Sequence, residues 1–419
     1  MRKNIALKML APMLFLSILY FAFAKVEINC SVFLFGENDW IMTGVNSHCI
    51  EEVARVRQYC GGSKINFVPT QFFVDTNSDT IPEYFATKSG LEYYTINKTN
   101  IANFEKGLVN CFNFATISGF KTIEITPHLD DGTGGSEWRN AVVMNPLARY
   151  DGVYSYYDIM INPIVVALSK VYTNNPNINI YLALEGEMNL MLISYPDKWL
   201  KMLNVIRCML PSGSKVGVSV NFNKLCGMNY CDQNKIKQYN IPAIQNLFTS
   251  IDFLGMSSYP SINNIQNLQE FQNGVFALSD EFKLFGLDIS QFPDNGIEIH
   301  FSEFGIGGST CAGNEFPATN ISHITQCPYF GVFGPYSLKT DPWKSSQMKG
   351  FQIYYYKQLS RWVSQGTGPT FKVNAIYLWN VASWDVTGIY HESSSVEGSY
   401  RNYDVVSLLK SFNDDNVVP

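Results

Sequence analysis

The sequence predicts an α/β fold: a single (β/α)8 (TIM) barrel, in which helices surround a closed ring of eight parallel strands. Two observations predict it. Strand-like and helix-like segments alternate through eight units, and no linker, repeat or low-complexity segment divides the series. Open sheets with helices on both faces more often have five or six strands, so a count of eight favours a barrel.

Each expected strand is a short apolar run, and each expected helix is a longer amphipathic segment that follows it. The strands are 30–36, 65–74, 122–129, the first half of 177–189, 215–222, 251–256, 297–304 and 373–380. The helices are 48–60, 97–117, 156–172, 197–210, 236–248, 268–287, 347–365 and 405–412. No linker or repeat interrupts the series, so residues 25–419 are expected to form one barrel domain.

Three connections are much longer than the others. They follow the third strand (130–155), the seventh (305–346) and the eighth (381–403). All three lie at the carboxyl ends of strands, which is the face where barrel enzymes build their sites. We therefore expect a functional site at this face.

The first 24 residues differ from the rest of the chain and predict a secretory signal peptide. A basic start is followed by an apolar run, and Ala22-Phe23-Ala24 fits the small-x-small cleavage rule. The apolar run of about 16 residues is shorter than the ~20 that a spanning helix needs, and an uncleaved anchor is the alternative. The expected location is outside the cell, with no membrane association after cleavage.

The charge of the chain excludes some partners. Without the signal, the chain has 27 basic and 36 acidic residues, a formal charge of −9. An acidic protein is a poor ligand for nucleic acid or for an anionic membrane. We expect neither as a partner, and the sequence predicts no oligomeric state.

Nine cysteines follow the signal, and an odd count leaves at least one of them unpaired. Spacing favours the pairs Cys226–Cys231, Cys311–Cys327 and Cys49–Cys60, although spacing does not fix the connectivity. Sequons at Asn29, Asn97 and Asn320 agree with glycosylation in a eukaryotic secretory route. No CxxC pair occurs, so a zinc site is not expected.

The strongest chemical signal is a pair of glutamates at strand ends. The stretch NINIYLALEGEMN contains Glu185 and Glu187 at the end of the fourth strand, and GIEIHFSEFGIGG contains Glu303 at the end of the seventh. Burial of an unpaired carboxylate is costly, so carboxylates at these positions are expected to face a cavity. Opposed carboxylates suit glycosidic bond cleavage, in which one protonates the leaving oxygen and the other attacks the anomeric carbon or activates water. Two structural carboxylates in rim salt bridges are the alternative.

These strand ends resemble clan A of the glycoside hydrolases, which are barrel enzymes that retain anomeric configuration. The resemblance implies that Glu187 is the acid/base and that Glu303, within Ser-Glu-x-Gly, is the nucleophile. Tyr259 resembles the clan's tyrosine that hydrogen-bonds the nucleophile. Trp379 resembles the tryptophan under the cleaved sugar, and Asn380 beside it is a further expected substrate contact.

The third strand resembles glycoside hydrolase family 113, which contains β-mannanases. The shared features are Pro127-His128-Leu129-Asp130 and the downstream Trp138-Arg139, which implies that His128, Trp138 and Arg139 bind sugar. His128 beside Asp130 and Asp131 could also suggest a metal site, but no second histidine lies nearby. We expect no metal and no cofactor.

One position departs from the clan. Most members have Asn-Glu at the end of strand four, where the asparagine contacts the sugar 2-hydroxyl, whereas this chain has Gly186-Glu187. Glu185 is the alternative acid/base, because strand alternation would place it on the same side as Glu187 and one layer deeper. A buried, hydrogen-bonded carboxylate is the expectation for Glu185.

Other residues have weaker signals. Alternation predicts that His300 points away from Glu303 and packs between the sheet and the helices. Glu37 and Asn38 could contact substrate or cap the first connection. The possible stacking platforms, for each of which core packing is the alternative, are Trp40, Trp138, Trp343 and Trp384.

The sequence therefore predicts a secreted, retaining β-glycoside hydrolase that acts on a polysaccharide or oligosaccharide, with mannan favoured by the third-strand motif. A carbohydrate-binding protein on a decayed hydrolase barrel is an alternative that the missing asparagine supports. Transglycosylation by the same residues is another, and chain-internal versus chain-end attack stays open.

Overall fold

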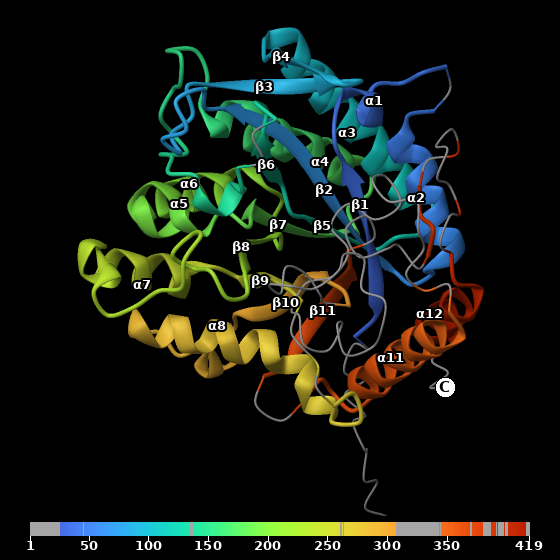
Figure 1. Cartoon of the computed structure of the whole chain (residues 1–419). Helices are drawn as coiled ribbons and strands as arrows, with labels where there is room; N and C mark the ends of the chain where they lie inside the picture. Colours follow the sequence, from blue (N-terminus) through green and yellow to red (C-terminus); the bar gives the residue numbers. More distant parts are fainter. Residues whose placement is uncertain are drawn as a thin grey trace, which may run out of the picture.

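The computed structural model describes residues 26–415, with gaps at 45, 135–136, 260–261, 263, 307–342, 344, 369–370, 380–386, 391, 393–397 and 399–400. Eight parallel strands form a closed ring at its centre (Figure 1). They are β1 (Ile28–Leu34), β2 (Lys64–Val74), β5 (Thr122–Ile125), β7 (Asn179–Gly186), β8 (Lys215–Asn221), β9 (Phe253–Ser258), β10 (Glu298–Phe304) and β11 (Val373–Leu378). Pairing of β1 with both β2 and β11 closes the ring, so the predicted (β/α)8 barrel is confirmed.

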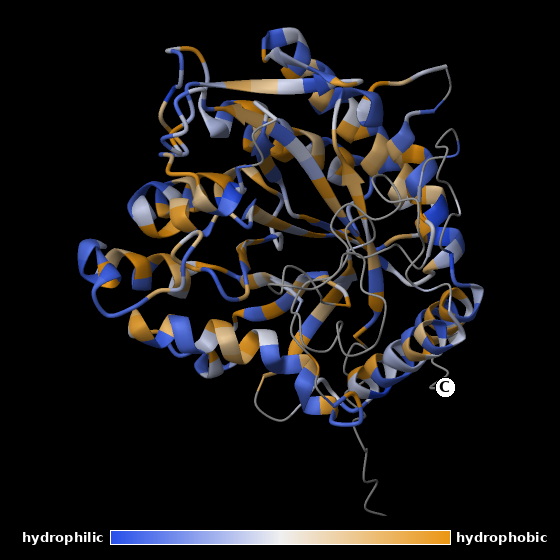
Figure 2. Ribbon diagram, viewed as in Figure 1, coloured by the Kyte–Doolittle hydropathy of each residue, from blue (hydrophilic) through white to orange (hydrophobic). Residues whose placement is uncertain are grey.

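Helices surround the ring (Figure 1). The main ones are α2 (His48–Tyr59), α3 (Lys98–Ile117), α4 (Asn162–Asn174), α6 (Pro196–Met209), α7 (Ile241–Ser250), α8 (Asn273–Leu284), α11 (Ser346–Ser364) and α12 (Tyr403–Asp415). Apolar and polar residues alternate along them, so that each can bury one face on the strands (Figure 2). Among the described residues, no helix is long and apolar enough to cross a membrane.

The predicted start of α3 agrees with the structure because the sequence provides a helix cap there. The side chain of Asn97 accepts hydrogen bonds from the backbone N–H groups of Thr99 and Asn100, and the Asn100 side chain accepts from the Asn97 N–H. This reciprocal cap satisfies donors that a helix start otherwise leaves unpaired.

The third strand is interrupted. The predicted segment 122–129 is split into β5 and β6 (His128–Asp131), which both pair with β2. Pro127 lies between them and has no N–H to contribute to the ladder. The break leaves His128 at the start of a new strand above the barrel.

A small sheet extends the barrel beyond β2 and was not predicted. β3 (Tyr84–Ser89) pairs antiparallel with the end of β2, and β4 (Glu92–Thr95) pairs with β3. Together with β6, these strands form the order β6-β2-β3-β4, and β3 and β4 lie at the top of the view in Figure 1. We call this four-stranded unit the rim sheet.

The prediction for His300 was wrong. Nδ1 of His300 lies 2.7 Å from Oε2 of Glu124, on the opposite side of the ring, and its ring stacks on Phe253. These contacts are possible only inside the barrel. Alternation fails as a guide because the register of β10 against β9 shifts between Phe301 and Glu303, so that both His300 and Glu303 face inward.

The disulfides agree with the predictions only in part. Cys226 pairs with Cys231 as expected. The predicted pair of Cys49 with Cys60 was wrong, because Cys49 bonds to Cys111 in α3 and Cys60 to Cys30 in β1. Cys208 is free and exposed. The predicted pair Cys311–Cys327 lies outside the described residues.

Candidate active site

The two predicted glutamates lie at the carboxyl ends of β7 and β10. Glu303 is the penultimate residue of β10, and Glu187 directly follows β7. Both are almost fully buried, with 3% and 7% of their surface exposed. Because burying a carboxylate is costly, each should have polar partners, and these differ between the two.

Three donors fix the carboxylate of Glu187. Nη1 of Arg139 donates to Oε2 at 2.8 Å, and Nε1 of Trp138 donates to the same oxygen at 3.3 Å. Nδ2 of Asn221 donates to Oε1 at 2.8 Å. Glu187 itself has a left-handed backbone conformation, with φ 58°. Such a conformation costs energy for a residue other than glycine, so it persists only where surrounding contacts hold it.

Asn221 is held in turn by two other buried asparagines. Its backbone N–H donates to Oδ1 of Asn189, while Nδ2 of Asn189 donates to the Asn221 carbonyl. The N–H of Asn189 donates to Oδ1 of Asn140. This network was not predicted, although Asn221 at the end of a predicted strand was a visible signal.

Glu303 has other contacts. The hydroxyl of Tyr259 donates to Oε2 at 3.1 Å, as the resemblance implied. Nε2 of His128 lies 2.9 Å from Oε1, although the angles of this contact fall outside those of a hydrogen bond. His128, predicted as a sugar ligand, therefore lies directly against the predicted nucleophile.

Burial dominates the protonation of these groups. It raises the pKa of Glu303 to about 7, although the charge of Arg139 and the hydrogen bond from Tyr259 act in the opposite direction. Burial and the charge of Arg139 lower the pKa of His128 to about 3, so its imidazole is neutral at neutral pH.

Arg139 connects the site to the rim sheet. Its Nη2 and Nε lie 2.7 Å from Oδ1 of Asp130 in β6, while Nη1 reaches Glu187. Burial opposes its charge, but Asp130 and Glu187 outweigh burial and raise the pKa of Arg139. The structure thus places both Arg139 and Trp138 against a catalytic candidate.

Glu185 is completely buried and bonds to backbone. Its carboxylate accepts hydrogen bonds from the N–H groups of Met188 at 2.7 Å and Ser219 at 2.9 Å. Burial outweighs these bonds and raises the pKa of Glu185 to about 8. The buried, hydrogen-bonded carboxylate expected at this position is present. The alternation used to relate it to Glu187 does not hold, because the register of β7 shifts between Ala183 and Gly186.

An aromatic cluster lies beside Glu303, to which its member Tyr259 donates a hydrogen bond. Trp379, Tyr259, Phe222 and Val68 pack together, with Phe33 against them. Trp379 is only 8% exposed, and its ring lies 5.5 Å from that of His128. Phe222 and Phe33 were not predicted as site residues, although both lie at strand ends.

The remaining candidates lie elsewhere. Trp40 is buried against Phe104, with ring centroids 4.9 Å apart, so it belongs to the core. Trp343 is also buried, and Glu37 accepts a hydrogen bond from Nδ2 of Asn100. Asn380 and Trp384 lie outside the described residues. Within the described part of the chain, no group of three His, Cys, Asp or Glu side chains is arranged to hold a metal ion.

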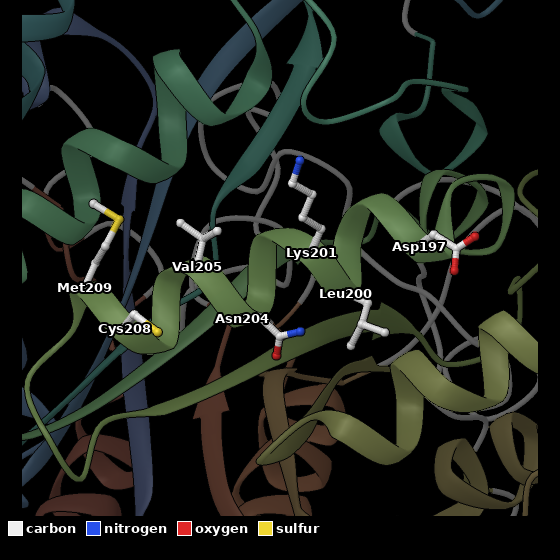
Figure 3. A pocket seen from close by; sticks show the side chains of 7 residues that line it. All are labelled: Asp197, Leu200, Lys201, Asn204, Val205, Cys208 and Met209. Carbon is white, nitrogen blue, oxygen red and sulfur yellow. The ribbon is translucent and has the colours of Figure 1, made fainter.

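A shallow hollow on the outer surface of α6 is separate from the site (Figure 3). It is lined by Asp197, Leu200, Lys201, Asn204, Val205, Cys208 and Met209. None of these side chains contacts Glu187 or Glu303. It has no geometry that suggests chemistry.

Together, the fold and the site define a (β/α)8 barrel with buried carboxylates at the ends of its fourth and seventh strands. A scan of protein-family models finds no match, and neither does a search of curated proteins. Among solved structures, the fold is similar to that of a GH113 β-1,4-mannanase, with TM-score 0.51 and 11% identity over 93% of this chain and 99% of that chain.

Two further solved structures align less well. An exo-β-1,4-mannosidase from Opitutaceae bacterium strain TAV5 has TM-score 0.42 and 12% identity, covering 93% of this chain and 59% of that one. A β-glucuronidase of Ruminococcus gnavus has TM-score 0.38 and 11% identity, covering 93% and 50%. Only the mannanase score indicates a shared fold, and identities this low indicate fold alone.

Proposed function

We propose that this protein is a retaining β-glycoside hydrolase, with Glu187 as acid/base and Glu303 as nucleophile. The observation that carries the proposal is the pair of buried carboxylates at the ends of barrel strands four and seven, each held by its own partners. Retaining glycosidases need two such carboxylates in different surroundings, since one must give a proton and the other must attack.

The reaction would proceed in two steps. First, a carboxylate oxygen of Glu303 bonds to the anomeric carbon while the glycosidic C–O bond breaks, and Glu187 gives its proton to the leaving oxygen. Second, a water molecule gives its proton to Glu187, and its oxygen displaces Glu303 from the anomeric carbon. Tyr259 orients the nucleophile, and Arg139 with Asn221 orients the acid/base.

The reverse assignment is a specific alternative. Three donors face Glu187, as an attacking carboxylate requires, whereas burial raises the pKa of Glu303 to about 7. We favour Glu303 as the nucleophile because Tyr259 donates to it and because its position matches the clan motif. Substrates with different leaving groups distinguish the two assignments.

A β-linked mannan is the substrate that we favour, on the third-strand motif. The mannanase that shares the fold agrees with this choice but does not decide it. A binding protein on a decayed barrel is the alternative that the missing asparagine supports, since the imidazole of His128 lies where a side chain at position 186 would project. Transglycosylation would use the same residues.

Secretion belongs to the same proposal. The described residues contain three disulfides, which persist in oxidising compartments. Residues 1–24 would direct the chain there as a cleaved signal, and residues 25–419 would form the barrel.

The test compares wild type with Glu187→Gln, Glu303→Gln and Glu185→Gln on aryl β-glycosides with good and poor leaving groups. Loss of the acid should slow cleavage of the poor leaving group by about 10²–10⁴-fold, but should spare the first step with the good one. Loss of the nucleophile should abolish both. We expect Glu187→Gln to show the first pattern, Glu303→Gln the second and Glu185→Gln neither.

The initial anomer of the product, followed by NMR, tests retention. A product that first appears as the β-anomer supports it, and an α-anomer excludes it. Wild type that is inert on mannan, glucan, xylan and galactan as well as on the aryl glycosides would contradict the hydrolase proposal.

A further inference from the structure

One face of the rim sheet carries three partly exposed side chains, those of Asp130, Lys88 and Tyr93, around the buried Phe72 and Ala86. Asp130 in β6 is opposite Phe72 in β2, and Phe72 is opposite Ala86 in β3. Lys88, two residues after Ala86, is opposite Tyr93 in β4. Directly opposed residues share a face of a sheet, as do residues two apart in one strand, so these five side chains lie on the same face.

Aromatic contacts connect this face to the catalytic site without a break. The ring of Trp379 lies 5.0 Å from Phe33, and Phe33 stacks on Phe35 at 5.2 Å. Phe35 lies 5.3 Å from Phe72, which lies 4.9 Å from Tyr93. Phe33, Phe35 and Tyr93 are each partly exposed. This series leads from the expected floor of the cleaved sugar to the rim sheet.

Lys88 lies at the end of the series. Its Nζ is 4.2 Å from the centroid of Phe35 and 5.4 Å from that of Tyr93. It is half-buried, and among the described residues no carboxylate lies within 4.0 Å of it. The three N–H donors of this ammonium group therefore lie beside the aromatic rings of Phe35 and Tyr93 without a direct ion pair.

Asp130 supplies an acceptor beside this donor. Its Oδ1 is bound to Arg139, which also holds Glu187, so its position is fixed relative to the catalytic site. Asp39 and Asp130 are close enough for their charges to act on Lys88. Carboxylates around the face would repel an anionic ligand, whereas paired donors and acceptors suit the hydroxyl groups of a neutral sugar.

We propose that this face of the rim sheet is a binding site for a second pyranose ring of a neutral oligosaccharide, with Lys88 donating to its hydroxyl groups and Asp130 accepting from them. The proposal rests on the proposed function. The aromatic series begins at Trp379, the expected floor of the cleaved sugar, and continues from it through Phe33 and Phe35 to Phe72 in β2. The second ring would therefore belong to the part of the chain that remains attached to the nucleophile.

The test varies the length of the substrate and the side chain of Lys88 together. Aryl β-glycosides of one, two and three sugars, in the mannose and glucose series, are compared on wild type, Lys88→Met and Lys201→Met. Methionine retains an unbranched apolar chain but removes the donor. Lys201 is an exposed lysine on the outer face of α6 and serves as the matched control. Thermal unfolding checks that each variant folds.

For wild type, kcat/KM should rise about tenfold or more from one sugar to two, as expected for a charge-assisted hydrogen bond and stacking. Lys88→Met should remove most of this gain while changing the one-sugar rate by less than about twofold. Lys201→Met should behave as wild type. An equal fall on one-sugar and two-sugar substrates would show that Lys88 only supports the fold, and no dependence on length would overturn the second site.

Binding is measured separately from turnover. Calorimetry of neutral tri- and tetrasaccharides with Glu303→Gln, with and without Lys88→Met, should show at least about tenfold weaker binding in the double variant. If wild type hydrolyses nothing but this difference is found, the hydrolase proposal fails and the sugar site stands. Absence of binding, or a preference for uronic acid oligosaccharides, would overturn the site.

Discussion

The imidazole of His128 occupies the space into which a side chain at position 186 would project. A Cβ atom on Gly186 would lie 2.7 Å from Cδ2 and 3.0 Å from Nε2 of His128, and 2.9 Å from Cγ2 of Thr126. Real Cβ atoms do not approach other atoms so closely. The glycine that departs from the clan pattern thus accompanies a histidine that lies against Glu303.

Restoring the clan residue should therefore damage this protein. Gly186→Asn and Gly186→Ala should force His128 away from Glu303 and cost about 1–3 kcal/mol of stability, as overpacking generally does. We expect kcat/KM to fall with both. The control is Gly186→Ala combined with His128→Ala, which removes the clash with His128 but not the one with Thr126, and so should recover part of the stability lost in Gly186→Ala. Strictly additive losses would contradict this account.

Activity should depend on the ionisation of Glu303. A nucleophile must be ionised, and burial raises the pKa of Glu303 to about 7, so kcat/KM should fall as the pH drops below about 7. If Glu303 were instead the acid, the fall would occur above that pH. The measurement is kcat/KM from about pH 4 to about pH 9.

The variant Tyr259→Phe tests the pKa of Glu303 in a second way. The tyrosine hydroxyl donates to the carboxylate and so lowers the pKa of Glu303. Removal of this donor should raise that pKa and move the acidic limb to higher pH. If the acidic limb of the pH profile did not move, the ionisation that causes it would belong to a group other than Glu303.

Arg139 should matter more than an ordinary ion-pair residue. Arg139→Met leaves Asp130 and Glu187 without their shared cation in a buried site, which typically costs about 3–5 kcal/mol. We expect kcat/KM to fall by about 100-fold or more, with a higher pKa of Glu303 because the charge of Arg139 lowers it.

Arg207→Met is the matched control for Arg139. Arg207 pairs with Asp252 at 2.9 Å, away from the mouth, and both side chains are partly exposed. Partly exposed pairs contribute about 1 kcal/mol or less, so this variant should keep its activity. Equal effects of the two substitutions on kcat/KM would refute a special role for Arg139.

The disulfide that closes a long loop and the one that closes a short loop should differ in their contribution to stability. Cys49–Cys111 spans 62 residues and Cys226–Cys231 spans 5. In the chain-entropy model, their removal costs about 4 and about 2 kcal/mol, respectively. Denaturant unfolding of Cys49→Ser/Cys111→Ser and Cys226→Ser/Cys231→Ser tests the order. A larger loss for the short loop would show that native-state contacts outweigh loop closure.

Several features of the site could be predicted from the sequence. The clan resemblance implied that Tyr259, just after the sixth strand, hydrogen-bonds Glu303, and the tyrosine hydroxyl does donate to that carboxylate. Carboxyl ends of parallel strands gather at one face of a barrel, so knowing the order of strands is enough to bring such residues together.

Other features could not be predicted from the sequence, and the reason differs between them. A shift within β10 brings both His300 and Glu303 inward, which alternation alone does not allow. The β3–β4 hairpin with Lys88 was missed because its strands are short and half-exposed. The partner of Cys49 is 62 residues away, beyond the reach of any local pattern.

By itself, the sequence determined the eight-unit barrel and the strand ends at which Glu187 and Glu303 lie. Both follow from local periodicity, which each segment carries independently of the rest. Only the tertiary structure decided what surrounds each carboxylate: Arg139, Trp138 and Asn221 at Glu187, and Tyr259 and His128 at Glu303. Those contacts arise where strands shift register and distant segments converge, and their geometry sets burial, hydrogen bonding and therefore pKa.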